Sequence, residues 1–250
     1  MRTVDVILFM GQSNMAGRGD DLTLAPPVME GTGYEYRAIS APGRLMPVSE
    51  PFGAEENNPD GVFEPGMKSG SMVSSFINAC YEKTKVPVVG VSCSKGGSSI
   101  LEWMPGTPYW KDSVCRYKKA VRWLERNEYE VRTVSMAWCQ GCTDGDRGMT
   151  GAEYKEKTAA FFRAWMQLGI QQIFLIQIGN HRDDARLYVQ IQEAQEELAA
   201  ELSSVMMVSR SFKALRDMGL MKDCYHYKQA GYNLVGTEAG AAAGEYLSGK

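Results

Sequence analysis

Short runs of apolar, often β-branched residues alternate along the chain with longer stretches in which apolar residues recur at helical spacing. The short runs are almost continuously apolar, which is typical of strands covered by helices on both faces of a sheet. They lie at residues 4–9, 86–92, 131–138, 172–178 and 204–208. The helical stretches lie at residues 69–83, 110–126, 151–168, 184–201 and 228–247. This order predicts an α/β protein, a three-layer α/β/α sandwich around a parallel sheet.

Five parallel strands fit a flavodoxin-like sheet better than a six-stranded dinucleotide-binding one. Residues 22–68 break the alternation, and seven of the ten prolines fall among them. A loop of this length is usually functional or disordered, so we expect either a long Pro-rich loop that shapes a pocket or an excursion without a role. Because the sequence contains no repeat, low-complexity tract or linker, we expect a single domain over residues 1–250.

The 250 residues include 27 basic and 30 acidic side chains, which gives a net charge of −3. This balance excludes a broad basic face for nucleic acid and gives no reason to expect binding to a membrane surface. No stretch reaches the roughly 18 to 20 apolar residues of a membrane span. Asp5 interrupts the apolar start, which argues against a signal peptide. We therefore expect a cytoplasmic protein with six reduced cysteines; the composition does not indicate an oligomeric state.

The first candidate for chemistry follows the first predicted strand, in the segment GQSNMAGRG at residues 11–19. Open α/β sheets bind ligands at the carboxyl ends of their strands, where Ser13 lies. If a helical turn begins at Asn14, the free N–H groups around Ser13 point towards any developing negative charge. Taken alone, Ser13 is more simply explained as the cap of that turn, because serine is a common cap.

Two further segments follow the second and third strands. In SKGGSSI at residues 94–100, adjacent glycines allow close approach of a ligand, although the order required of a phosphate-binding loop is absent. Trp103, just downstream, fits either a sugar-facing wall or the core. In WCQGCTDGD at residues 138–146, Gln140 is able to donate to an oxyanion. The Cys139-x-x-Cys142 pair is a weak metal or redox candidate, because a second such pair is missing and the chain has only two histidines.

The fourth segment, DCYH at residues 223–226, contains one of these two histidines. Asp223 lies three residues before His226, so its carboxylate can accept a hydrogen bond from one ring nitrogen and leave the other free as a base. The second histidine, His181, has no aspartate three residues before it, and we expect it in a loop or at the rim of the site.

Taken in chain order, the four segments resemble the SGNH-hydrolase superfamily. Within it they resemble the sialate O-acetylesterase and acetylxylan esterase branch of carbohydrate esterases. That branch carries the segments G-Q-S-N-M-x-G, G-G-T-S-I, W-x-Q-G-E-x-D and D-x-x-H. Here they read GQSNMAG, GGSSI, WCQGCTD and DCYH, between residues 11 and 226. Cys142 departs from this pattern, because it stands where the branch has glutamate.

The resemblance implies that Ser13 is the nucleophile, that His226 is the general base and that Asp223 orients His226. It implies an oxyanion hole made of the backbone N–H groups of Ser13 and Gly97 and the side chain of Gln140. The activity implied is removal of O-acetyl groups from a carbohydrate through an acyl-enzyme, with no cofactor and no metal.

The substrate would be an acetylated xylo-oligosaccharide or an O-acetylated sialic acid. Arg18 and Trp103 are the expected substrate-binding residues, Arg18 either for the carboxylate of sialic acid or as a structural arginine. Two alternatives stay open. One is a carbohydrate-binding protein without catalysis, suggested by the lost glutamate; the other is a lipid or thioester hydrolase of the same superfamily.

Overall fold

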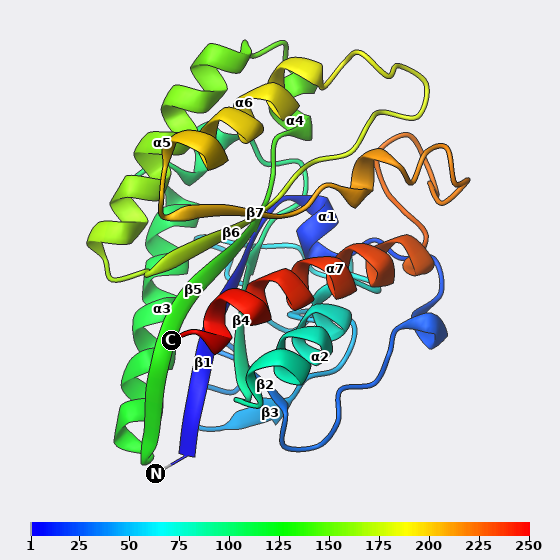
Figure 1. The fold of residues 1–250 in the computed structure, drawn as a ribbon. Coiled ribbons are helices and arrows are strands. Elements are labelled where there is room, and N and C mark those ends of the chain that lie inside the picture. Colours follow the sequence, from blue (N-terminus) through cyan, green and yellow to red (C-terminus); the bar gives the residue numbers. More distant parts are fainter. Residues whose placement is uncertain (1) are drawn as a thin grey trace.

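The computed structural model describes residues 2–250, which form α-helices on both sides of one twisted sheet (Figure 1). The strand order across the sheet is β3-β2-β4-β1-β5-β6-β7. The five expected strands are all present and parallel: β1 (Arg2–Gly11), β4 (Val88–Ser94), β5 (Tyr129–Cys139), β6 (Gln172–Ile176) and β7 (Val205–Ser209). Counted in chain order, they lie second, first, third, fourth and fifth across the sheet, which is the flavodoxin-like order.

The expected number of strands was wrong, because the sheet has seven. The two additional strands, β2 (Gly33–Tyr36) and β3 (Leu45–Pro47), lie within the Pro-rich segment 22–68. β2 pairs in parallel with β4, and β3 extends the edge in the antiparallel direction. Strands of four and three residues are too short to give a recognisable hydrophobic pattern.

The helices form two layers, as the hydrophobic pattern predicts. α3 (Pro108–Arg126), α5 (Gly151–Gln167) and α6 (Val189–Glu201) bury their apolar residues on one face of the sheet. α2 (Val73–Thr84) and α7 (Gln229–Ser248) cover the other face. β1 contacts both layers, because Val6 and Leu8 pack into the first core and Ile7 and Phe9 into the second. None of the helices within residues 2–250 is long and apolar enough to cross a bilayer.

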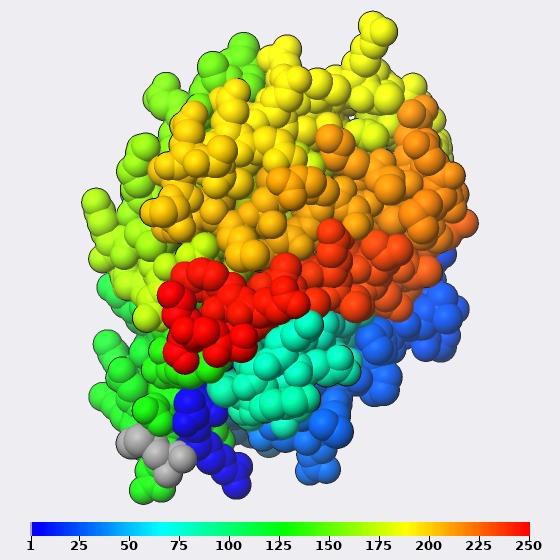
Figure 2. Space-filling view, in the orientation of Figure 1, coloured from blue at the N-terminus to red at the C-terminus, as the bar shows by residue number. Residues whose placement is uncertain are grey.

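α2 and α7 lie directly against each other at the surface, as the adjacent cyan-green and red elements of Figure 2 show. Glycines on α7 allow this approach: a Cβ atom at Gly240 would lie 2.1 Å from the carbonyl oxygen of Phe76. The close contact fixes α7, and the segment that precedes α7 carries His226.

Buried charged groups hold the Pro-rich segment together and attach it to the body of the protein. Glu56 accepts hydrogen bonds from the backbone N–H groups of Ile39 and Ser40. Arg116 of α3 is fully buried and donates to the carbonyl oxygens of Glu56 and Ser92. These contacts order the segment, which lines the cavity described next with Phe63, Glu64, Pro65 and Met67.

Candidate active site

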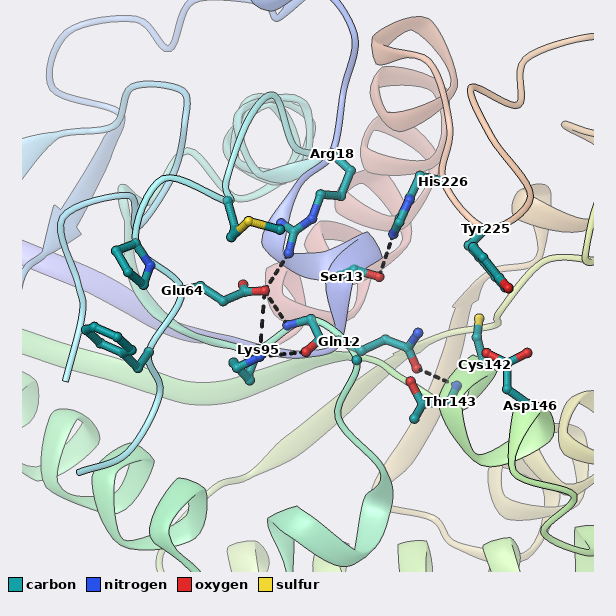
Figure 3. Close-up of a pocket in the computed structure, with 15 residues that line it drawn as sticks. Gln12, Ser13, Arg18, Glu64, Lys95, Cys142, Thr143, Asp146, Tyr225 and His226 are labelled. Atoms are coloured by element: carbon teal, nitrogen blue, oxygen red, sulfur yellow. Dashed lines mark hydrogen bonds and ion pairs between the residues drawn. The ribbon is translucent and has the colours of Figure 1, made fainter. Parts of the chain in front are cut away.

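Ser13, His226 and Asp223 are joined by two hydrogen bonds, of which Figure 3 shows the one between Ser13 and His226. The Oγ atom of Ser13 lies 3.0 Å from Nε2 of His226, and Nδ1 of His226 lies 2.8 Å from Oδ2 of Asp223. When Nδ1 carries the proton and donates it to Asp223, Nε2 is left to accept the hydroxyl proton of Ser13. This arrangement is that of a serine, a base and an orienting carboxylate.

Ser13 is placed by the end of β1 and by the short helix α1 (Ser13–Ala16) that begins at once. Gly11 closes the strand with φ 136°, and a Cβ atom there would lie 2.1 Å from the carbonyl oxygen of Cys139, so only glycine fits. Asn14 connects this turn to the other end of the chain: it donates to the carbonyl oxygen of Tyr225 and accepts from the hydroxyl of Tyr232.

Asp223 is prepared as an acceptor by its own turn. Its Oδ1 atom accepts the backbone N–H groups of Tyr225 and His226, both at 2.8 Å. Partial burial by itself raises the pKa of Asp223, but the hydrogen bonds from the Tyr225 amide and from the ring and amide of His226 outweigh it. The pKa of this carboxyl is therefore held below its usual value, so Asp223 is ionised at neutral pH.

A cavity of about 580 Å³ opens over Ser13 and His226. This volume lies within the range of about 300–1,000 Å³ that is usual for small-molecule sites. The cavity is formed at the carboxyl ends of β1, β4 and β5, and the Pro-rich segment and Tyr225 line its sides. It lies where open α/β sheets bind their ligands.

Several N–H groups belong to residues that line this cavity. The N–H of Ser13 opens α1 and therefore has no acceptor within the helix. Gly97 has φ 68° in the turn after β4, and its N–H has no hydrogen-bond acceptor among the described residues. Gln12 accepts the N–H groups of Gly141 and Thr143 through Oε1, which leaves its Nε2 atom directed into the cavity (Figure 3).

The structure does not bring Gln140 to the cavity, which corrects its expected place in an oxyanion hole. Gln140 is fully buried, and its Nε2 atom donates to the carbonyl oxygen of Ser98 and to the carboxylate of Asp144. Both amide protons are used by these bonds, so none is left for a substrate. Gln140 and Asp144 instead connect the turns after β4 and β5.

Trp103 is also corrected as a substrate contact. Its side chain is fully buried and its Nε1 atom donates to Oγ of Ser98 at 2.9 Å. Trp103 closes the short helix η2 (Ile100–Trp103) and packs against Trp138 in the core. Of the two readings of this residue, core packing is therefore the one that the structure favours.

Arg18 does line the cavity, but its charge is paired. The guanidinium group donates to Oε1 of Glu64 at 2.5 Å and to the carbonyl oxygen of Gly17. The same Glu64 oxygen accepts the N–H of Gly96 at 2.8 Å and lies 4.0 Å from Nζ of Lys95. Glu64 thus joins the turn after β1 to the turn after β4, and its sequence context gave no sign of this role.

Cys142, which begins the short helix α4 (Cys142–Asp146), reaches the cavity wall as a free thiol. Burial raises the pKa of the Cys142 thiol well above its usual value, so the sulfur is not a thiolate at neutral pH. Residues 2–250 hold no group of three His, Cys, Asp or Glu side chains arranged to bind a metal ion. His181 lies at the rim, as expected, with its ring packed against that of Tyr225.

The family model for "carbohydrate esterase, sialic acid-specific acetylesterase" matches residues 3–244. The chain belongs to this family. Family members are carboxylic ester hydrolases, so the chain is a carbohydrate esterase with the α/β fold of SGNH hydrolases. No curated protein matches it by sequence.

Solved structures resemble this esterase in fold. An Arabidopsis thaliana protein superposes with a TM-score of 0.70 at 21% identity, with 98% of each chain covered. A carbohydrate acetylesterase from Xanthomonas citri gives 0.63 at 19% identity, covering 98% of this chain and 57% of the other. An acetylxylan esterase from Geobacillus stearothermophilus gives 0.53 at 13% identity, covering 96% and 93%.

Sequence reasoning missed Gln12, Glu64 and Tyr225 as cavity residues. Gln12 directly precedes Ser13, and Tyr225 directly precedes His226. Their position beside these candidate catalytic residues was therefore a signal that they lie near the site. Glu64 had none, because nothing local relates it to Arg18, 46 positions earlier in the chain.

Proposed function

We propose that this esterase removes O-acetyl groups from a carbohydrate through an acyl-enzyme on Ser13. The observation that carries the proposal is the hydrogen-bonded row of Ser13, His226 and Asp223 at the base of a cavity large enough for a sugar. A hydroxyl 3.0 Å from an imidazole nitrogen, whose other nitrogen faces an ionised carboxylate, is activated for nucleophilic attack.

In the first step, Nε2 of His226 takes the proton of Ser13 while Oγ attacks the acetyl carbonyl carbon. The negative charge that develops on the carbonyl oxygen is stabilised by the N–H groups of Ser13 and Gly97 and by Nε2 of Gln12. Gln12 therefore supplies the side-chain N–H donor to the oxyanion that the sequence analysis had expected from Gln140. Asp223 stabilises the imidazolium and remains ionised throughout.

In the second step, the bond between the carbonyl carbon and the sugar oxygen breaks, and His226 gives its proton to that oxygen. The sugar leaves with a free hydroxyl, and the acetyl group stays on Ser13 as an ester. Water, deprotonated by His226, then attacks this ester, and acetate leaves as Ser13 recovers its proton.

The charges around the cavity favour a neutral sugar as the substrate. Arg18 and Lys95 are balanced by Glu64 and Asp146, so the lining has no net positive charge for a sugar carboxylate. Arg18 in particular already donates to a carboxylate inside the protein. An acetylated xylo-oligosaccharide therefore fits better than an O-acetylated sialic acid, although the family description names sialic acid.

The test is hydrolysis of p-nitrophenyl acetate, acetylated xylo-oligosaccharides and O-acetylated sialic acids by the wild type and by Ser13→Ala. We expect release of acetate from the neutral oligosaccharides and loss of all activity in the variant. A fluorophosphonate probe should label the wild type only. Full activity of Ser13→Ala would refute the proposal, and binding of glycans without labelling of Ser13 would establish a non-catalytic carbohydrate-binding protein instead. Preference for acyl lipids or thioesters would place the activity outside carbohydrates.

A further inference from the structure

A second cavity, of about 530 Å³, lies beside the one over Ser13. The two share Phe63 and Lys95 as a common wall, so one is the continuation of the other. The rest of its lining consists of Pro59, Asp60, Gly61, Pro108 and Tyr109. None of them takes part in the proposed chemistry.

The two sides of this second cavity are held together by α3, which forms one side and binds the other. Asp112 of α3 accepts the side-chain amide of Asn58 and the backbone N–H of Val62, both at 2.9 Å. Gly61 lies so close that a Cβ atom there would be 2.4 Å from Asp112. The turn at residues 58–62 is thereby held against the beginning of α3, which supplies Pro108 and Tyr109. A site whose walls are already ordered loses little conformational entropy when a ligand binds.

Tyr109 is a half-buried aromatic residue of this cavity. Its ring packs on the buried Trp103, with 5.3 Å between ring centroids and 52° between planes. Trp103 therefore supports the cavity from beneath without reaching a ligand. The packing fixes one side of the Tyr109 ring and leaves the phenol able to contact a ligand.

The chemistry of these walls fits a pyranose ring. The ring faces of Phe63 and Tyr109 and the flat surfaces of Pro59 and Pro108 suit the C–H face of a sugar. Asp60 and Lys95 supply an acceptor and a donor for its hydroxyl groups, and their opposite charges favour no net charge in the ligand.

We infer that the second cavity binds a neighbouring sugar residue of an oligosaccharide whose acetylated residue occupies the cavity over Ser13. The inference rests on the proposed esterase activity and adds the place where the next sugar residue of the oligosaccharide binds. Tyr109 contacts the neighbouring sugar, at a distance from the bond that breaks.

The experiment compares Tyr109→Ala, Tyr109→Phe and the control Tyr81→Ala, a half-buried tyrosine of α2 that lines neither cavity. Three substrates are used: p-nitrophenyl acetate, an O-acetylated methyl xyloside and acetylated xylotetraose. Tyr109→Ala should lower kcat/KM on the tetrasaccharide about fivefold to tenfold through KM, and change the two small substrates less than about twofold. Tyr109→Phe and Tyr81→Ala should leave all three substrates unchanged.

Binding provides a second measurement that does not depend on turnover. Unacetylated xylotetraose should bind Ser13→Ala in calorimetry, and the additional Tyr109→Ala substitution should weaken that binding about fivefold to tenfold. Equal losses on all three substrates, no preference of the wild type for the tetrasaccharide, or unchanged binding would each overturn the inference. These results leave the esterase proposal standing, because that proposal is tested separately by the activity of Ser13→Ala, by labelling of Ser13 and by the preference for acetylated carbohydrates.

Discussion

His226 Nε2 lies 3.0 Å from Ser13 Oγ, although 213 residues separate the two in the chain. Three hydrogen bonds hold the segments on either side of this contact together. Lys222 donates to the carbonyl oxygen of Arg18, the backbone N–H of Gln229 donates to Asp20, and Asn14 donates to the carbonyl oxygen of Tyr225. The serine and the imidazole are therefore fixed relative to each other before a substrate arrives, which is what efficient proton transfer requires.

Replacing Asp223 by Asn should lower kcat on p-nitrophenyl acetate about 10⁴-fold, because the ring of His226 is then held in the wrong tautomer. The protein should stay folded, since the amide oxygen still accepts the N–H groups of Tyr225 and His226. Steady-state rates together with thermal melting separate the two effects. A loss of only a few fold would mean that Asp223 does not orient the base.

Gln12→Glu should lower kcat about a hundredfold or more, because the variant loses an N–H donor that faces the developing oxyanion. The substitution keeps the oxygen that accepts from Gly141 and Thr143, so the fold should be little affected. Gln140→Ala is the comparison. It leaves the Ser98 carbonyl without its donor, removes one of the donors to Asp144 and should cost about 1–3 kcal/mol of unfolding free energy. A larger fall in kcat for Gln140→Ala than for Gln12→Glu would return the oxyanion role to Gln140.

Glu64→Gln should shift the substrate preference towards anionic sugars. The variant retains an acceptor for the N–H of Gly96 but no longer neutralises Arg18. The ratio of kcat/KM for O-acetylated sialic acid to that for acetylated xylotetraose should rise about threefold to tenfold. Glu55→Gln makes the same change of charge on an exposed residue that does not line the cavity and should leave the ratio constant. An unchanged ratio in Glu64→Gln would show that the charge of Arg18 does not reach the substrate.

Lys68 makes the stability of the protein depend on pH in the alkaline range. Burial, assisted by the nearby charge of Arg116, lowers the pKa of Lys68 to about 8, while its Nζ atom donates to Ser92 at 2.8 Å. In the unfolded chain the pKa of lysine is about 10.4. Between these two values the unfolded state binds one proton more, so the free energy of unfolding rises with pH, by at most about 1.4 kcal/mol per pH unit.

Urea denaturation of the wild type and of Lys68→Met at pH values from 6 to 10 measures this contribution. The difference between wild type and variant should be constant below pH 7 and should move in favour of the wild type as the pH rises through 8. Tyrosines and cysteines also titrate in this pH range, but they do so in both proteins. Their contributions to the free energy of unfolding therefore cancel in the difference. A difference that stays constant up to pH 10 would contradict the lowered pKa.

Local pattern was sufficient for most of the architecture. Continuous apolar runs identify the five long strands, because a strand covered on both faces has no exposed positions to interrupt the pattern. Amphipathic spacing places the five long helices within a few residues of their observed bounds. β2 and β3 escaped detection, because strands of three and four residues are recognised by the neighbours with which they pair.

The sequence by itself determined the order of the strands and helices and the Asp-x-x-His turn, since these depend on residues close together in the chain. Only the tertiary structure decided which glutamine faces the cavity, that Arg18 is paired with Glu64, and that Tyr109 and not Trp103 is open to a ligand. The hydrophobic pattern of the sequence predicts which residues are buried, but it does not predict which groups they contact. The direction of an amide and the pairing of a charge depend on groups that the fold brings together from distant parts of the chain.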